Sequence, residues 1–203
     1  MTAFKVSPRG SWLLALRLAA AGVALSLAAA CAATGTDPAK PGQAASTATE
    51  VKPAKLAAGQ DVPLTKKPIL AVGGKISNPN DGDVLQLGVD TLDQFRLMKV
   101  NVYEPWAKER MGFQGVWLAD VLDAAGVDGS ASGVHVAALD DYGVDLTMAE
   151  IDAGGILLAT KSQDGSPIAI DEGGPTRVVF LDGVGSGASP DQWIWSLKDI
   201  SVR

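Results

Sequence analysis

The chain has 203 residues, which favours one domain with appendages over two full domains, and 47% of the residues are hydrophobic, so a substantial core is expected. The formal net charge is −6, which makes nucleic acid an unfavourable partner and any electrostatic attraction to an anionic lipid surface weak. The single cysteine excludes a disulfide within the chain and a cysteine-based zinc or iron–sulfur site.

Residues 1–30 are predicted to be a signal peptide, because basic residues precede an apolar stretch that ends in small residues. Cys31 follows directly and resembles the lipidated cysteine of a bacterial lipobox, although Ala28 stands where that motif usually has leucine. Two interpretations are open. Either Cys31 carries a lipid that anchors the protein to a membrane in the periplasm or cell envelope, or a signal peptidase cuts at an Ala-x-Ala site and Cys31 is incidental.

Residues 31–67 are predicted to form a disordered tether that begins at the lipid-anchored cysteine. The segment is rich in alanine, threonine, proline, lysine and glycine and has almost no large apolar residue. Such a composition buries too little surface to offset the entropy lost on ordering. As a coil, the segment would have a root-mean-square reach of roughly 30–35 Å.

The folded domain is expected over residues 68–203, with short strands and a few short helices. Strands are predicted at 69–72, 84–87, 97–103, 134–138, 156–159, 177–181 and 192–202, the last with Trp193 and Trp195 on one face. Asp164-Gly165 is a turn signal followed by the apolar segment 168–170, and 183–190 is a predicted loop.

Three helical segments are predicted among these strands. Residues 91–95 form one turn with Thr91 and Gln94 at capping-box spacing, and residues 147–150 begin a short helix with the same spacing. The clearest helix, 118–125, has its apolar residues at positions i, i+3, i+4 and i+7 and ends before Gly126. Strands interspersed with short helices at irregular intervals predict an α+β fold.

Several segments together resemble, in order and spacing, the oxidoreductase molybdopterin-binding domain, the catalytic fold of sulfite oxidases and their bacterial relatives. They are Phe113–Leu122 with Gly126, Asp140–Gly143, Leu157–Val179 and the closing stretch 193–202. The resemblance covers nearly all of residues 68–203. It implies an α+β fold with mixed sheets and short helices.

The resemblance also raises the question of the cofactor, since the family holds molybdenum through a pterin and one cysteine thiolate. In the family that cysteine precedes the Gly-Val-x-Leu segment, but the corresponding residues 98–112 contain none. His135, the only histidine, does not match the family's pterin-site histidine, and Arg9 is a single arginine where a twin-arginine export signal would have two. We therefore expect no metal and no cofactor, with molybdopterin as the alternative.

These features predict an exported lipoprotein whose domain is a non-catalytic module that binds a small ligand or a periplasmic protein partner. Two alternatives stay open. One is a periplasmic molybdopterin-dependent oxidoreductase, and the other is a structural accessory lipoprotein.

Six residues are candidates for ligand binding. Arg177 could hold an oxyanion or a pterin-like ring, or it could pair with a nearby carboxylate at the start of a strand. Trp106, Lys108 and Arg110 lie in the loop expected to face the family's cofactor cleft, where they could bind a flat anionic ligand or form a solvated charged loop.

Asp141 and Tyr142 complete the set of candidates. Asp140 and Asp141 are adjacent carboxylates that are better explained by a turn with a side-chain-to-backbone hydrogen bond than by shared acid–base work. Tyr142, like Trp193 and Trp195, could instead pack in the core or at its rim.

Overall fold

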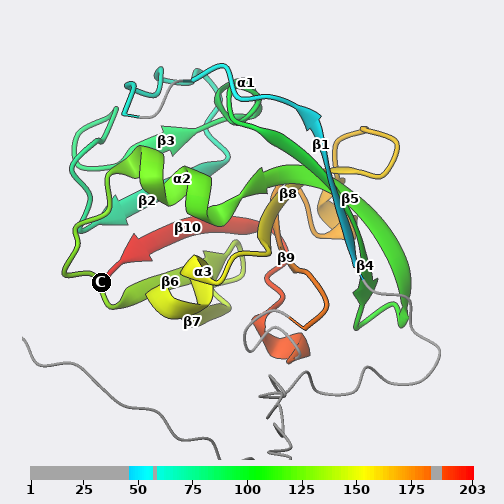
Figure 1. Ribbon diagram of the computed structural model, residues 1–203. Coiled ribbons are helices and arrows are strands. Elements are labelled where there is room, and N and C mark those ends of the chain that lie inside the picture. The colour runs from blue at the N-terminus through cyan, green and yellow to red at the C-terminus, as the bar shows by residue number, and fades with distance from the viewer. Residues whose placement is uncertain (1–45, 57–58, 184–188) are drawn as a thin grey trace, which may run out of the picture. The chain divides into compact units, whose positions relative to one another are not determined.

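The computed structural model describes residues 46–56, 59–183 and 189–203 (Figure 1). The predicted signal peptide 1–30, Cys31 and the first part of the predicted tether lie outside the described residues. Within them, two five-stranded sheets dominate the fold and the helices are short. None of these helices has both the length and the apolar character that a membrane span requires.

The first sheet is antiparallel throughout, in the order β1-β4-β5-β8-β9 (Figure 1). Its strands are β1 (Thr47–Lys52), β4 (Leu97–Glu104), β5 (Glu109–Trp117), β8 (Ile156–Ser162) and β9 (Arg177–Phe180). Met98, Val100 and Val102 of β4 are buried, which confirms the predicted alternation of that strand. Leu97, predicted on the other face, is buried as well.

The second sheet is mixed, in the order β3-β2-β10-β6-β7. Its strands are β2 (Leu70–Gly74), β3 (Leu85–Leu87), β6 (Gly133–Ala138), β7 (Gly143–Thr147) and β10 (Leu197–Val202). The pair β10 and β2 is parallel, and the other pairs are antiparallel. Most of the buried hydrophobic side chains of both sheets belong to one hydrophobic core.

The described helices are α1 (Val89–Leu92), α2 (Leu118–Ala125) and α3 (Met148–Asp152), with 3₁₀ turns η1 (Ile170–Glu172) and η2 (Pro190–Gln192). Helix α2 matches its prediction, because the residues at the i, i+3, i+4 and i+7 positions are the buried ones and Gly126 ends the helix at φ 66°. Thr147 and Glu150 form the predicted reciprocal capping box of α3.

The prediction of a disordered tether is wrong for its second half. Residues 47–52 form β1, and Val62 and Thr65 are buried. The side chains of β1 are mostly exposed, so this strand is held by backbone pairing with β4 rather than by burial of large apolar residues. The folded unit therefore begins before residue 68.

Other local predictions also needed correction. Thr91 is not the N-cap of α1 but its third residue, and its hydroxyl accepts a hydrogen bond from the Gly88 N–H at 2.7 Å. Strands β5 and β7 were not predicted, because glycines and polar residues interrupt their alternation. The apolar segment 168–170 leads into η1, which begins at Ile170.

The predicted strand 192–202 begins only at Leu197. Ser196 has φ 51°, which interrupts the extended backbone, and the preceding residues hydrogen-bond to other segments. Ile194 O accepts from Val178 N at 2.8 Å, and Ser196 N donates to Gly173 O at 2.7 Å. Trp193 and Trp195 therefore do not share one face of a strand: Trp193 is buried and Trp195 is 40% exposed.

Candidate functional site

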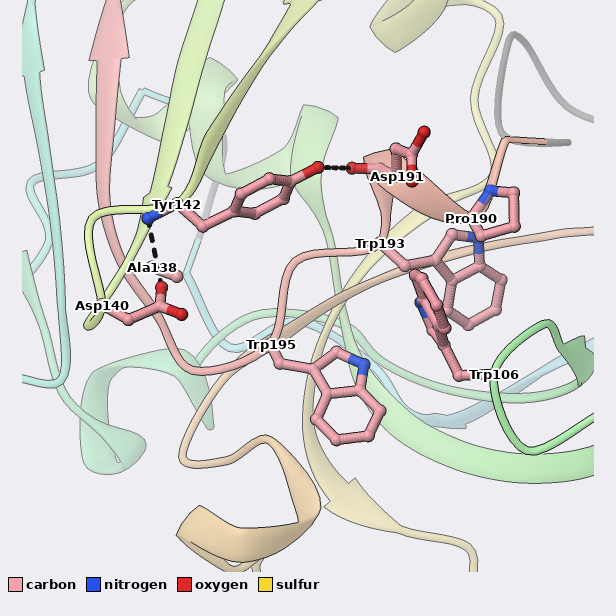
Figure 2. A pocket seen from close by; sticks show the side chains of 8 residues that line it. All are labelled: Trp106, Ala138, Asp140, Tyr142, Pro190, Asp191, Trp193 and Trp195. Carbon is pink, nitrogen blue, oxygen red and sulfur yellow. Dashed lines mark hydrogen bonds between the residues drawn. The ribbon is translucent and has the colours of Figure 1, made fainter.

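An aromatic cavity of about 500 Å³ lies at the ends of both sheets (Figure 2). Its lining comes from three places: the turn between β4 and β5, the end of β6 with the turn into β7, and the segment from η2 to the start of β10. The lining residues are Trp106, Ala138, Asp140, Tyr142, Pro190, Asp191, Trp193 and Trp195. We refer to this site below as the aromatic cavity.

The turn between β6 and β7 places Asp140 and Tyr142. Ala138 N donates to Tyr142 O at 2.8 Å, and Tyr142 N donates to the Asp140 carboxylate at 3.1 Å. This is the side-chain-to-backbone hydrogen bond that the sequence predicted. Asp141 takes the left-handed conformation at φ 66°, which aspartate tolerates in turns.

Tyr142 also ties the turn to the opposite wall of the cavity. Its hydroxyl donates a hydrogen bond to the Asp191 backbone carbonyl at 2.8 Å (Figure 2). The ring remains 47% exposed, so the hydrogen bond orients the side chain without burying it. This hydrogen bond thereby connects the β6–β7 turn to η2 across the cavity.

Trp193 and Trp195 both line the cavity from the segment between η2 and β10, but they differ in how deeply they are buried. Trp193 packs against Phe180 with ring centroids 6.1 Å apart and is part of the core. Trp195 packs against Gly173, where an added Cβ would lie 2.8 Å from the indole Cγ. Gly173 also has φ 84°, a backbone conformation that favours glycine. Both this conformation and the close contact with Trp195 therefore disfavour any larger residue at this position.

Arg177 lies behind the cavity and does not line it. Its guanidinium forms an ion pair with Glu104 at 2.9 Å, and both side chains are almost fully buried. It also donates to Glu172 O at 3.1 Å and lies 5.1 Å from the ring centroid of Phe113 and 4.4 Å from that of Trp195. Burial lowers the pKa of the guanidinium, and Glu104 opposes this shift. Of the two interpretations from the sequence, the geometry matches the carboxylate pair.

Lys108 and Arg110 do not join Trp106 at the cavity either. Arg110 lies in β5, where it pairs with Asp182 at 3.0 Å and donates to the Asn101 side chain at 2.7 Å. Lys108 is exposed in the turn at φ 58°. The structure therefore does not bring Lys108 and Arg110 together with Trp106 to form the expected site for an anionic ligand.

The charge of the lining is negative. Among the residues that the structure describes, the lining includes the acidic residues Asp140 and Asp191 and no lysine or arginine. Asp141 points elsewhere and pairs with Lys198 at 2.7 Å, and this hydrogen bond holds the pKa of Asp141 below its ordinary value. Of the six candidates from the sequence, only Trp106 and Tyr142 line the cavity.

Asp140 and Asp191 were missed as ligand-binding candidates. Asp191 follows Pro190 in a segment with no recognisable motif, and its place in the lining depends on contacts with residues far away in the chain. Trp193 and Trp195 were noted in the sequence, but only as packing residues. Nothing local in the sequence joins these side chains into one site.

Comparison with known proteins identifies the family. The family model of the oxidoreductase molybdopterin binding domain matches residues 90–200, more than half of the chain, so the chain belongs to this family. Among solved structures it is similar to the sulfane dehydrogenase SoxCD from Paracoccus pantotrophus, with 16% sequence identity and a TM-score of 0.51. The match covers 66% of this chain but only 37% of that chain, and at this identity it shows the fold alone. No curated protein matches.

The residues of this domain do not fit a molybdenum pterin. The family holds molybdenum through the pterin and one cysteine thiolate, and the only cysteine, Cys31, lies outside the matched segment 90–200. Across the described ranges, no cluster of three or more histidine, cysteine, aspartate or glutamate side chains could hold a metal ion.

Proposed function

We propose that this member of the family is a non-catalytic binding module that holds a small organic ligand in the aromatic cavity. The observation that carries the proposal is the lining: three tryptophans and one tyrosine surround about 500 Å³, together with two carboxylates. Volume and composition fall in the range of small-molecule sites, which combine apolar walls with a few polar groups.

The exposure of the aromatic rings supports a bound ligand. Trp106, Tyr142 and Trp195 are 57%, 47% and 40% exposed. Leu139, between two lining residues, is exposed as well. Covering apolar surface contributes roughly 25 cal/mol per Å², so a ligand that covers these rings gains stabilisation that the free protein lacks. Isolated exposed apolar residues are ordinary, but this cluster lies around one cavity.

The donor chemistry argues against the alternative of a molybdopterin-dependent oxidoreductase. The family contributes one thiolate to the metal, and no other side chain readily replaces it. Arg177, the residue that resemblance suggested for the pterin, is already paired with Glu104 and covered by aromatic rings. The family membership thus accounts for the fold, whereas the function that we propose is inferred from the aromatic cavity.

The proposal includes a location. The signal-like residues 1–30 and the single cysteine at position 31 support export and lipid attachment to a membrane of the cell envelope. Metabolic labelling with a radioactive fatty acid is expected to mark the wild-type protein and not the Cys31→Ser variant. Labelling of both proteins would contradict attachment through Cys31.

Two measurements test the binding function. Metal analysis of the protein purified from its native host is expected to find no molybdenum in proportion to protein, and a stoichiometric amount would restore the oxidoreductase. A panel of cationic, neutral and anionic small molecules is then titrated while tryptophan fluorescence and the melting temperature are followed. At least one member is expected to bind saturably, and binding raises the melting temperature because only the folded state binds.

The matched variant for the panel is Trp106→Ala, which removes an exposed wall and should change folding stability little. Binding that disappears in Trp106→Ala supports the aromatic cavity as the site. Binding that survives unchanged places the ligand elsewhere, and a panel without any binder favours a structural accessory protein.

A further inference from the structure

We propose that the ligand of the aromatic cavity is an organic cation of the quaternary-ammonium class, an inference that rests on the binding function proposed above. The lining combines electron-rich aromatic rings with two acidic residues, and none of its described residues is a lysine or an arginine. A cation without N–H donors needs no directed acceptors, and it is attracted to ring faces and to nearby negative charge.

The rings are arranged as walls around the space. In Figure 2, Tyr142 lies on one side of the opening, Trp106 and Trp193 on the other, and Trp195 below. Tryptophan is the strongest of the aromatic side chains in attracting cations, and cages of several rings are the usual site for methylated ammonium groups. Trp106 is 57% exposed and Trp195, whose ring also contacts Arg177, is 40% exposed, so a ligand can reach both side chains.

The described cations nearest the site are already paired with other carboxylates. Lys198 of β10, which contacts the β6–β7 turn, is paired with Asp141 at 2.7 Å, and Arg177, next to Trp195, is paired with Glu104 at 2.9 Å. Among the described residues, Asp140 accepts a hydrogen bond from the Tyr142 backbone N–H, and Asp140 and Asp191 both belong to the lining. A cationic ligand would supply the missing counter-charge.

A metal cation fits the site less well. Calcium takes six to eight oxygen ligands, and magnesium requires an octahedral set. The lining offers the carboxylates of Asp140 and Asp191 among four aromatic rings, and the part of the chain that the structure describes contains no cluster of three or more ligating side chains. The apolar walls instead favour methyl groups around a delocalised charge.

The fold already contains the same interaction with an internal cation. The guanidinium of Arg177 lies 4.4 Å from the centroid of Trp195 and 5.1 Å from that of Phe113. A ring of the cavity wall therefore attracts a cation within this protein. The proposed ligand would make a similar contact between a cation and an aromatic ring inside the aromatic cavity.

The test compares choline with its neutral isostere, the alcohol in which carbon replaces the nitrogen. Calorimetric titration of the full-length protein is expected to show choline binding about tenfold more tightly than the isostere, since cation–π attraction supplies the difference. Raising the salt concentration should weaken choline binding and leave the isostere unaffected. Both should lose binding in Trp106→Ala.

Charge variants complete the experiment. Asp140→Asn and Asp191→Asn should each weaken choline binding several-fold and leave the isostere unchanged, and the exposed Asp152→Asn outside the lining serves as the matched control. Equal affinity for choline and the isostere, with both lost in Trp106→Ala, would overturn the cationic ligand and leave the binding function standing. Failure of both probes overturns the cationic ligand, and only failure of the whole panel as well removes the binding function.

Discussion

Two regions of this domain meet at Trp195, the buried pair of Arg177 and Glu104 on one side and the aromatic cavity on the other. Both combine charge with aromatic rings. In the buried region the chain supplies the cation and the carboxylate, and both are almost fully covered. In the cavity the described residues supply aromatic rings and acidic side chains but no lysine or arginine. The buried pair is complete within the fold, whereas the cavity lacks the cation, and this difference is the basis of the binding that we propose.

The buried region should respond most strongly to mutation. Arg177→Ala leaves Glu104 as a buried carboxylate without its ion pair, and we expect a loss of about 3–5 kcal/mol in the free energy of unfolding. Urea denaturation measures this loss. The double variant Glu104→Gln with Arg177→Met removes both charges and should lose less than Arg177→Ala alone. A single-variant loss within the range of an exposed substitution would contradict a structural role for the pair.

Gly173 controls the position of Trp195 between the two regions. Alanine at this position would combine φ 84° with a Cβ 2.8 Å from the indole. The left-handed backbone alone costs about 1–2 kcal/mol, and displacement of Trp195 should add to this loss and weaken ligand binding. Gly154→Ala is the matched control, because φ 80° is similar but nothing lies within 4 Å of its added Cβ. Equal losses in both variants would show that contact with Trp195 contributes nothing.

The elements with local signals were predictable from the sequence. Helix α2 carries its apolar stripe and its terminal glycine within nine residues, and the structure has both. Strand β1 was missed because its side chains are mostly exposed, so only pairing with β4, some fifty residues later, makes it a strand. Hydrophobic periodicity in a sequence indicates which side chains are buried. It does not detect β1, because that strand is held by backbone hydrogen bonds rather than by buried side chains.

The candidate site was predictable only in part, for a related reason. Trp106 and Tyr142 were among the predicted ligand-binding residues, but the cavity also needs Asp191 and Trp195, and no spacing relates these four positions. The role of Arg177 depended on Glu104, which lies 73 residues away in the chain. Charge pairing between distant segments decides which candidates line the cavity, and a single sequence does not reveal that pairing.

Tyr142 tests how firmly the cavity is held open. Tyr142→Phe removes the hydrogen bond to the Asp191 carbonyl and keeps the ring. We expect at most about 1 kcal/mol of lost stability, since the side chain is half exposed and water can replace the hydroxyl. The affinity for the ligand should fall clearly, whereas the melting temperature should change little. Tyr103→Phe is the control, because Tyr103 is the other tyrosine and does not line the cavity.

The smallest effect should come from the pair at the rim, Asp141 and Lys198. The hydrogen bond from Lys198 holds the pKa of Asp141 below its ordinary 3.8, so this contribution to stability is present above that pH and is lost as the pH falls through the folded-state pKa. Asp141 raises the pKa of Lys198 above its ordinary 10.5, so the contribution is also lost as the pH rises beyond that value.

Asp141→Asn should therefore lower the melting temperature slightly near neutral pH, because asparagine keeps the left-handed turn but loses the charge. The difference from wild type should narrow toward both pH extremes, and scanning calorimetry across pH measures it. The same variant frees Lys198 beside Asp140, so it should also weaken binding of a cation and spare the neutral isostere. An Asp141→Asn variant that binds choline more tightly would contradict the view that Asp141 keeps Lys198 from neutralising the cavity.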